Sequence, residues 1–387
     1  MPFDLSEWLN LALRWLHLTA GIAWIGSSFY FVWLDNHLRK PADGEASGEL
    51  WSVHGGGFYH NQKYQVAPSQ MPEQLHWFKW EAYFTWISGF SLLVLIYYVG
   101  AESFLIDPAK AALSPAQGIA IGLAAQALGW LVYDGLCRSP VGSSNLALGA
   151  FWFIVLLFAG SLLDSLFSAR AAYLHVGAII GTVMVANVFF IIIPNQRKVV
   201  ADLVAGRTPD PALGQAAKQR SLHNNYMTLP VLFIMISNHY PMTWGAERPW
   251  LVLALLGLTG VAIRHVFNLR GRGRPTGRTI VLAAALALAS VTYVTLEKGG
   301  RTSRGPARNV TYAEVAPILA THCAACHAVQ PPPRGVALDS WEHASAASAR
   351  IKAVAVDTQV MPLGNPTHMT EAERRTLGAW IAAGSPR

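Results

Sequence analysis

The stretch "LALGAFWFIVLLFAGSLL", residues 146–163, contains no charged side chain. A helix rises about 1.5 Å per residue, so roughly 20 apolar residues are needed to cross the hydrocarbon core of a bilayer. The whole chain of 387 residues is 52% hydrophobic and only 13% charged, which is too apolar for an ordinary soluble domain. The stretch therefore indicates a helix of a membrane protein.

Similar apolar runs lie on both sides of this one, and together they predict an all-α bundle of eight transmembrane helices. The predicted spans are Trp8–Leu34, Ala82–Val99, Gly118–Tyr133, Leu146–Leu163, Ala172–Ile193, Tyr226–His239, Pro249–Val266 and Thr279–Leu296. The sixth is short and is interrupted by Pro230. The first run continues beyond the usual core of a secretory signal, so it is expected to remain as an anchor.

Basic residues in the connections between these runs predict the orientation of the bundle. Connections on one side carry fourteen Lys and Arg residues, and those on the other carry Lys110, Arg170 and Arg248. Because cytoplasmic loops are enriched in Lys and Arg, both termini are predicted to face the periplasm of a bacterial inner membrane. Dispersal of the basic residues among short loops argues for membrane lipid and against nucleic acid as a partner, despite a net charge of +7. The fourteen are Arg39, Lys40, Lys63, Lys79, Arg138, Arg197, Lys198, Arg207, Lys218, Arg220, Arg270, Arg272, Arg274 and Arg278.

The two halves of the bundle share a pattern of polar residues. Leu16-His17 in the first run precedes Arg39-Lys40 by the same interval as Leu174-His175 in the fifth precedes Arg197-Lys198. With four predicted spans in each half, this pattern is typical of a 4+4 parallel repeat about an axis along the membrane normal. The alternative is that amphipathic span ends simply resemble one another.

His17 and His175 are ionisable residues inside predicted spans, at matching depths. A buried ionisable group in a span is costly and is a functional candidate by default. The two imidazoles could bind the iron of a haem b, with Arg14 and Arg170 near its propionates. The alternative is that each histidine makes a hydrogen bond to a neighbouring helix.

The chain changes in character after Leu296. The stretch "EKGGRTSRGPARN", residues 297–309, is basic, rich in Gly and without periodicity, so it predicts a flexible linker. In the small soluble domain that follows, Thr370-x-x-Glu373 has the form of a capping box that begins the last helix. The expected organisation is a membrane domain over 1–296, a linker over 297–309 and a second domain over 310–387.

The motif "THCAACH" in that second domain contains Cys323-x-x-Cys326-His327. Two thiols at this spacing can form thioethers to haem vinyl groups while the adjacent histidine binds the iron, so the motif predicts covalent haem c. Met361, in a loop stiffened by the next proline, is the predicted sixth ligand, and Met369 is the alternative. The layout resembles a class I cytochrome c. A zinc or redox site is the competing interpretation.

Two predicted connections are long and dense in His, Asn, Gln and Tyr, which suits a polar aromatic ligand. They contain "GGGFYHNQKY" (55–64), "MPEQLHWFKWEAYFTW" (71–86) and "SLHNNYMTLPVLFIMISNHYPMTWG" (221–245). These stretches closely resemble the bacterial membrane-bound urate oxidases, whose eight-span domain is fused to a C-terminal cytochrome c. The resemblance implies oxidation of urate to 5-hydroxyisourate. The electrons would leave through cytochrome c to a terminal oxidase or soluble cytochrome, without forming hydrogen peroxide.

The chemistry of urate suggests which residues form such a site. A planar anion needs a cation, amide groups and an aromatic ring, and the candidates for binding it are Gln62, Lys63, Trp77, Asn224 and Arg264. A histidine titrates near neutral pH, so the proton released on oxidation could be taken by His60, His76 or His265.

Two other functions fit the same sequence features. One is a membrane subunit that transfers electrons from quinol to cytochrome c and has no urate site. The other is a haem or metal transporter that carries a redox domain. Urate-dependent cytochrome reduction separates the first alternative from a urate oxidase, and measurements of metal or haem uptake test the second.

Overall fold

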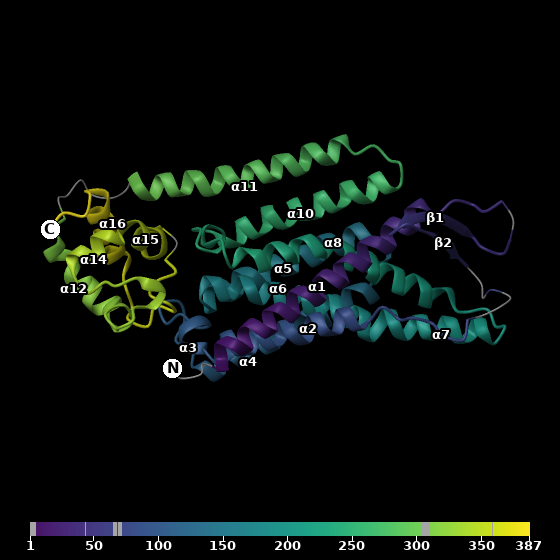
Figure 1. Ribbon diagram of the computed structural model, residues 1–387, viewed down its shortest axis with the longest axis horizontal. Coiled ribbons are helices and arrows are strands. Elements are labelled where there is room, and N and C mark those ends of the chain that lie inside the picture. Colours follow the sequence, from purple (N-terminus) through teal and green to yellow (C-terminus); the bar gives the residue numbers. More distant parts are fainter. Residues whose placement is uncertain (1–4, 43, 65–67, 69–71, 304–309, 358) are drawn as a thin grey trace.

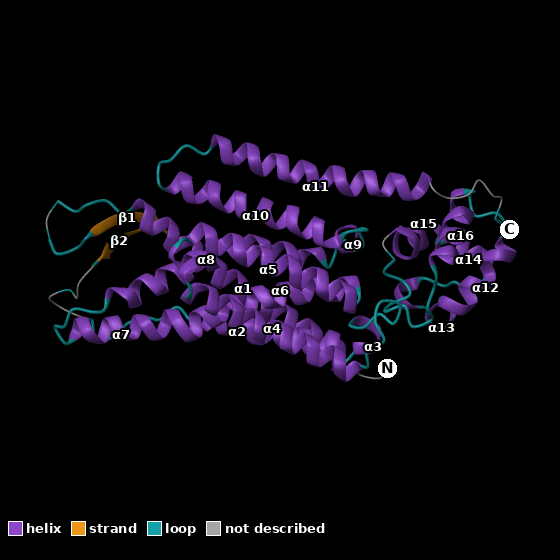
Figure 2. Cartoon of the chain, turned by 180° about the vertical axis from the view of Figure 1, so that it is seen from behind, coloured by secondary structure: helices purple, strands orange, loops and turns teal. Residues whose placement is uncertain are grey.

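The computed structural model describes residues 5–42, 44–64, 68, 72–303, 310–357 and 359–387. It consists of a bundle of long helices and a smaller helical C-terminal domain, residues 310–387, which lies at one end of the bundle (Figure 1). The N-terminus lies at that same end, and a β-hairpin lies at the other (Figure 2). We call these the C-terminal-domain end and the hairpin end.

The bundle is built from long helices joined by short turns. Its elements are α1 (Leu5–His37), β1 (Gly48–His54), β2 (Gly57–Lys63), α2 (Trp80–Leu93), the π-helical turn η1 (Val94–Tyr98), α3 (Ala101–Phe104), α4 (Pro115–Arg138), η2 (Pro140–Ser143), α5 (Asn145–Leu166), α6 (Ala169–Ala186), the π-helical turn η3 (Asn187–Ile192), α7 (Ile193–Val204), α8 (Pro211–Ser237), α9 (Pro241–Trp244), α10 (Pro249–Gly271) and α11 (Gly277–Ser303). Side-chain caps begin several of them: Ser114 forms a capping box with Gln117 before α4, and Ser144 and Ser168 cap α5 and α6.

Five helices in the described ranges are long and apolar enough to cross a membrane by length and composition. They span Pro115–Arg138, Asn145–Leu166, Ala169–Val204, Pro249–Gly271 and Gly277–Glu297. Helices also lie at the other three predicted spans, but α1 carries Asn10, Arg14 and His17, α2 is rich in aromatic and hydroxyl residues, and the first half of α8 is polar. Membrane insertion of these three, and hence the count of eight, stays a prediction.

Helix α6 lies at the centre of the bundle, and apolar side chains of outer helices face outward. Most of α6 is buried, with packing against α4, α5 and α8. By contrast, Leu128, Phe158 and Leu288 on α4, α5 and α11 are well exposed. Lipid tails accept such apolar surfaces, since the backbone polar groups of a helix are satisfied internally. The bundle is therefore compatible with a membrane protein.

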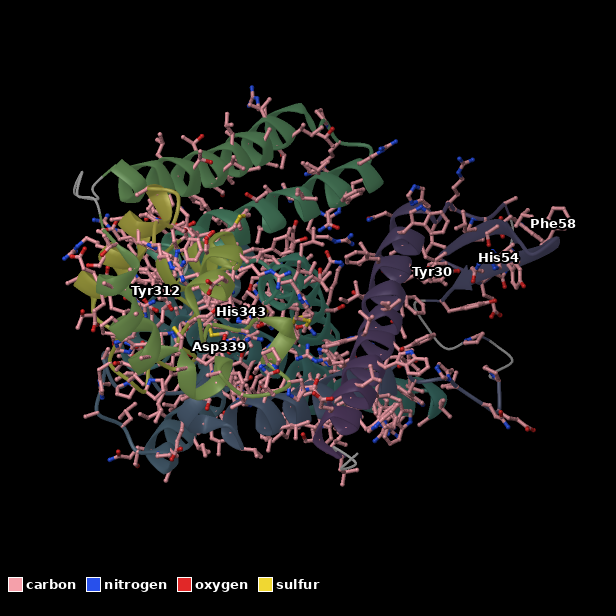
Figure 3. The ribbon with its side chains drawn as sticks, turned by 60° about the vertical axis from the view of Figure 1, so that its left-hand side comes forward. Tyr30, His54, Phe58, Tyr312, Asp339 and His343 are labelled. Atoms are coloured by element: carbon pink, nitrogen blue, oxygen red, sulfur yellow. The ribbon has the colours of Figure 1, made fainter. Side chains whose placement is uncertain are left out.

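A β-hairpin departs from the all-α prediction. Strands β1 and β2 are antiparallel, with Trp51 opposite His60 and His54 opposite Gly57. Gly55 and Gly56 form the two-residue turn, and both have positive φ, +57° and +80°. A tight hairpin turn needs two such residues, which glycine supplies without strain. The hairpin projects from the bundle, with His54 and Phe58 near its tip and far from Tyr312, Asp339 and His343 in the C-terminal domain (Figure 3).

The C-terminal domain has its own hydrophobic core. Its elements are α12 (Tyr312–His322), α13 (Ala324–His327), η4 (Pro333–Gly335), α14 (Trp341–Ala346), α15 (Ser348–Ile351), η5 (Lys352–Asp357) and α16 (Glu371–Ala382). Val315, Leu377 and Trp380 are fully buried in this core. The predicted linker is partly helical, because α11 continues through Ser303; residues 304–309 of it lie outside the described residues.

Candidate functional site

A cluster of polar side chains joins α8 to α10 in the half of the bundle nearer the hairpin end. Arg264 Nε on α10 donates to Asn225 Oδ1 on α8 at 2.9 Å, and Asn268 Nδ2 donates to the same oxygen at 3.1 Å. Residues 264 and 268 are one helical turn apart and so share a face of α10. The guanidinium carbon of Arg264 lies 3.8 Å from the ring centroid of Phe29 on α1. We call Phe29, Asn225, Arg264 and Asn268 the Arg264 cluster.

The Arg264 cluster has polar groups without partners. Asn225 Nδ2 and Asn268 Oδ1 are buried and have no hydrogen-bond partner among the described residues. Arg264 is 6% exposed, and no carboxylate in the described part of the chain forms an ion pair with it. Leaving a buried polar group unpaired costs about 1–3 kcal/mol, and more for a charge. The cluster therefore has the features of a site for an anionic ligand that offers both a hydrogen-bond acceptor and a donor.

A tyrosine and a histidine pair lies beside this cluster. The Tyr226 hydroxyl is 2.7 Å from His265 Nδ1. These residues follow Asn225 and Arg264 directly in sequence, and His265 is half-buried. The pair can hold or transfer a proton, because a neutral imidazole carries both a donor and an acceptor nitrogen. The structure thus brings His265, a predicted proton acceptor, to the same place as Arg264.

A second polar network nearby is complete. Arg220 on α8 donates to Asp134 Oδ1 at 2.6 Å and to Asn187 Oδ1 at 3.2 Å. Asn187 Nδ2 donates to Asn224 Oδ1 at 2.8 Å, and Asn224 Nδ2 donates to the Met184 carbonyl at 2.9 Å. Both amide atoms of Asn224, a predicted substrate-binding residue, are therefore occupied. This network holds α8 against α4 and α6.

The hairpin residues of the predicted site lie apart from these clusters. His60 Nε2 is 2.8 Å from the Glu49 carboxylate, and its ring stacks on Trp51 with centroids 4.2 Å apart. Lys63 forms an ion pair with Asp35 at 2.7 Å. Such exposed pairs contribute little to stability, typically below about 1 kcal/mol. His60 and Lys63 thus interact with neighbours at the hairpin, outside the Arg264 cluster.

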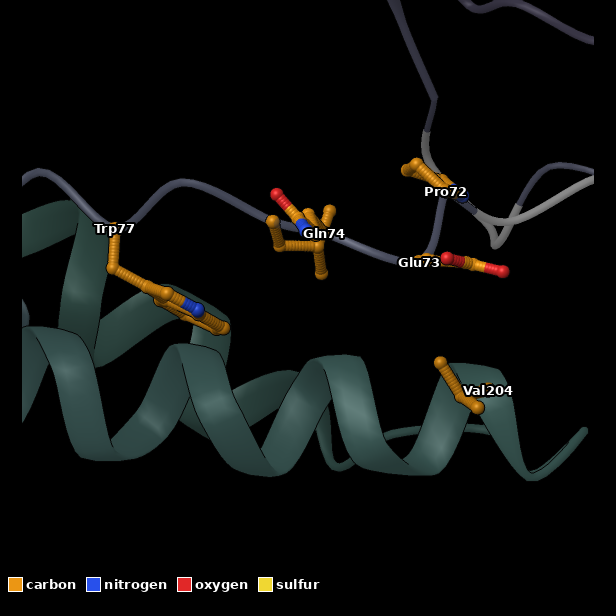
Figure 4. Close-up of a pocket in the computed structure, with 6 residues that line it drawn as sticks. Pro72, Glu73, Gln74, Trp77 and Val204 are labelled. Carbon is orange, nitrogen blue, oxygen red and sulfur yellow. The ribbon is translucent and has the colours of Figure 1, made fainter.

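Of the remaining predicted residues, Gln62 lies on β2, and His76 and Trp77 lie on the segment that leads into α2. Gln62 Oε1 accepts a hydrogen bond from the Tyr64 hydroxyl, and the His76 ring packs edge-on to Phe78 at 4.6 Å. Trp77 lines an open pocket of about 650 Å³ together with Pro72, Glu73, Gln74, Leu75 and Val204 (Figure 4). The eight predicted substrate and catalytic residues therefore fall into three groups: the hairpin, the segment before α2, and the α8–α10 region.

His17 and His175 both lie against glycines of neighbouring helices. His17 Nδ1 is 2.9 Å from the Thr85 carbonyl, and His175 Nδ1 is 2.8 Å from the Ala171 carbonyl, so each ring can donate from Nδ1. A Cβ added at Gly89 or Gly122 would lie 2.7 Å from the His17 or the His175 ring, respectively. Both rings therefore fill notches that only glycine leaves open.

The arginines that precede these histidines approach one tyrosine. Arg14 and Arg170 both lie close enough to the Tyr97 hydroxyl to interact with it electrostatically. The hydroxyl oxygen is buried, and Arg170 is the one of the two placed to interact with it as a hydrogen-bond donor. The Tyr97 ring also meets His175 edge-on, with centroids 6.3 Å apart. The region between α1, η1 and α6 thus combines two cations with a buried hydroxyl group.

Comparison with known proteins identifies most of this bundle. The family described as Urate oxidase N-terminal matches residues 4–295, which is three quarters of the chain. The chain belongs to the urate oxidase N-terminal family. No curated protein and no solved structure gives a significant match. The family region contains the Arg264 cluster, the hairpin and both buried histidines, and it ends before the C-terminal domain.

The C-terminal domain, beyond the urate oxidase family region, contains the cysteine motif. His327 Nδ1 lies 2.8 Å from the Val336 carbonyl, which leaves Nε2 free for a metal. Cys323 and Cys326 are free thiols, and burial raises the pKa of Cys323 to about 11. Within the described residues no group of three or more His, Cys, Asp and Glu side chains could hold a metal ion, so the zinc interpretation finds no further ligands there.

The two methionines of this domain differ in their surroundings. Met369 is 4% exposed and belongs to the domain core, whereas Met361 is half-buried at the edge of that core. Buried Arg374 donates to the Met361 carbonyl at 2.7 Å and also to the Ala355 carbonyl, which fixes the loop that carries Met361. Met369 thus packs inside the domain core and Met361 lies at its edge, and the choice of Met361 as an iron ligand stays a prediction.

Proposed function

We propose that this member of the urate oxidase N-terminal family oxidises urate to 5-hydroxyisourate at the Arg264 cluster and passes the electrons to a cytochrome c formed by its C-terminal domain. Family membership supports urate as the substrate. The observation that carries the position of the site is the buried Arg264 beside the unpaired Asn225 Nδ2 and Asn268 Oδ1. No other described cluster combines an unpaired cation with an unpaired donor and acceptor.

Each group of the Arg264 cluster has a role in binding the substrate. Urate is a planar purine anion near neutral pH, with carbonyl oxygens and ring N–H groups at its edge. Arg264 pairs with the negative charge, Asn225 Nδ2 donates to a carbonyl oxygen, and Asn268 Oδ1 accepts from a ring N–H. Hydrogen bonds to a charged partner are worth about 1.5–3 kcal/mol each, enough to select urate over a neutral purine.

The His265 and Tyr226 pair handles protons. Urate and one water give 5-hydroxyisourate, two electrons and two protons. When His265 Nδ1–H donates to the Tyr226 oxygen, the lone pair of Nε2 is free to take one of these protons. Tyr226 thereby selects the tautomer of the base. His60 pairs with Glu49 and His76 packs against Phe78, so these two other predicted bases are not used in this mechanism.

The proposed C-terminal cytochrome would hold haem c through Cys323 and Cys326, and His327 and Met361 are the side chains that would bind its iron. Haem c, when bound, supplies a one-electron acceptor. The Val336 carbonyl accepts the His327 Nδ1 proton and orients the ring with Nε2 outward. Arg374 holds the Met361 loop against the domain core. These contacts support a haem c site formed by this chain's own residues.

We extend the proposal to a haem b held by His17 and His175. When bound, this group would supply a second one-electron carrier between the substrate and the cytochrome. The Nδ1 contacts with backbone carbonyls support such a site, because they leave Nε2 of each ring for a second partner; in His175 that partner is at present the Tyr98 hydroxyl, at 3.3 Å, which a bound iron would replace. The basic residues of the connections support a periplasmic C-terminal domain, with a terminal oxidase or soluble cytochrome as the acceptor.

Arg264→Gln tests this function, and Arg270→Gln on the exposed face of the same helix is its control. Loss of about 1.5–3 kcal/mol should weaken urate binding by roughly 10- to 150-fold, as measured by calorimetry on purified protein. Urate-driven reduction of haem c should fall in parallel, while dithionite still reduces haem c fully. The control should behave as the unmodified protein does.

Two results would overturn the proposal. If Arg264→Gln bound urate as tightly as the unmodified protein, the site would lie elsewhere. If the unmodified protein reduced haem c with a quinol but never with urate, the chain would be a quinol-linked electron-transfer subunit instead. Haem content and melting temperature, measured on each variant, separate a lost ligand contact from a misfolded protein.

A further inference from the structure

A loop of the C-terminal domain, residues 359–365, contacts the bundle. A Cβ added at Gly364 would lie 2.7 Å from the Glu102 carbonyl oxygen and 3.0 Å from that of Ser103, both in α3. Val360 packs against the hydrophobic core of the bundle. Both views of the chain place α3 beside this domain (Figures 1 and 2). The loop that touches α3 is therefore the loop that carries Met361.

Gly364 is suited to this close contact in two ways. Its φ is +66°, in the left-handed region that side chains rarely adopt. It also lets two backbones approach to a distance that no Cβ would tolerate. A charge contact accompanies it, since Asp107, just after α3, acts electrostatically on buried Arg374, which holds the Met361 carbonyl. The loop at Gly364 and helix α3 are therefore complementary in shape and form an interface between the C-terminal domain and the bundle.

On the bundle side, packed aromatic rings lead inward from α3. The Phe104 ring of α3 meets Tyr97 at 6.4 Å, and Tyr97 meets His175 at 6.3 Å. Ser168, at the start of α6, ties α3 to this group by donating from its hydroxyl to the Phe104 carbonyl at 2.7 Å. Covalent and van der Waals contact is therefore continuous from Gly364 through α3 to His175.

We propose that the contact of Gly364 with α3, together with that of Val360 with the bundle core, is the interdomain electron-transfer junction, which docks the C-terminal domain with its Met361 loop facing the bundle. The inference rests on the proposed function. Haem c, when bound at Cys323 and Cys326, would supply the one-electron acceptor on the C-terminal side of this junction. No bond is made or broken and no proton crosses the junction.

Gly364→Ala in the full-length protein tests the junction, with Gly384→Ala as its control. Gly384 also has a positive φ, +86°, but a Cβ there meets nothing within 4 Å. The clash of the first variant should lower the docked population on the order of tenfold. Hydrogen exchange at residues 103–107 should then quicken, because the domain no longer covers α3. Urate-driven reduction of haem c should slow by a similar factor.

Val360→Ser serves as a second variant, because it weakens the apolar contact without adding backbone strain. Both variants should retain full haem c content, unchanged urate affinity and full reduction by dithionite, as should Gly384→Ala. If exchange at 103–107 and the reduction rate stay unchanged in both Gly364→Ala and Val360→Ser, the junction is wrong. Failure of the unmodified protein to reduce haem c with urate would instead count against the proposed function, and the exchange result would still report whether the domain docks.

Discussion

Asn224 and Asn225 show how neighbouring residues of one helix come to differ. The sequence predicted a substrate contact at Asn224, but the Asn224 amide bonds to Asn187 and Met184, and Asn225 is the residue that faces Arg264. Successive residues of a helix point about 100° apart, since 3.6 residues complete one turn. The residue type could therefore be predicted, but the choice between neighbours depends on how α8 is rotated against α10.

The pair of asparagines gives a direct prediction. Asn225→Ala should weaken urate binding on the order of tenfold, because it removes a donor to the substrate. Asn224→Ala should leave urate affinity unchanged and lower the free energy of unfolding by about 1–3 kcal/mol, because Asn187 and Met184 lose buried partners. Titration calorimetry and thermal melts on both variants check this. The opposite assignment of the two effects would place the substrate at the Asn224 network.

At the scale of elements, a sequence pattern predicted the structure correctly where the interaction joins residues close together in the chain. The capping box at Thr370 and Glu373 was predicted and is confirmed, since Thr370 caps α16 and both hydrogen bonds of the box are present. The hairpin was missed because "VHGGGFYH" was read as a polar connection, although two glycines between alternating residues indicate a tight turn. The glycines near residue 299 predicted a flexible linker, but α11 continues through them to Ser303.

The same capping box predicts a pH dependence. Hydrogen bonds from the Thr370 backbone and hydroxyl, then His322, lower the pKa of Glu373 from 4.5 to about 2. A carboxyl group whose pKa is lower in the folded state stabilises the fold above pH 4.5, and this contribution disappears as the pH falls toward 2. Glu373→Gln should therefore destabilise the C-terminal domain by about 1 kcal/mol at pH 7. Melts followed by haem c absorbance should show that difference shrinking between pH 4.5 and 2; a constant difference would refute the assignment.

At the scale of the whole molecule, the sequence predicted where the helices lie along the chain, and it predicted that the N-terminus and the C-terminal domain lie on the same side. Its apolar runs coincide with long helices, and the C-terminal domain lies at the N-terminal end of the bundle (Figure 1). It could not bring the predicted site residues together. His60, Trp77 and Arg264 are far apart in sequence, and their separation into three groups follows from helix packing, which no local pattern specifies.

Topology yields a prediction at this scale. Arg207 follows α7 at the hairpin end, and Leu296 in α11 lies near the C-terminal-domain end (Figure 1). Since the basic residues gather in connections toward the hairpin end, a phosphatase reporter, which needs the periplasm, should be silent after Arg207 and active after Leu296. A cytoplasmic reporter at the same two positions should give the reverse. Phosphatase activity after Arg207 would contradict the orientation.

The connection between α11 and the C-terminal domain sets a further property of the docked loop. The chain between Ser303 and Val310 cannot exceed about 25 Å at roughly 3.5 Å per residue. A domain tethered by so short a linker meets its partner surface at an effective concentration in the millimolar range. The C-terminal domain then stays mostly bound to α3 even if the intrinsic dissociation constant is millimolar. A contact that weak dissociates quickly. The C-terminal domain can therefore leave α3 after each turnover and, under the proposed function, present the same edge to an external acceptor.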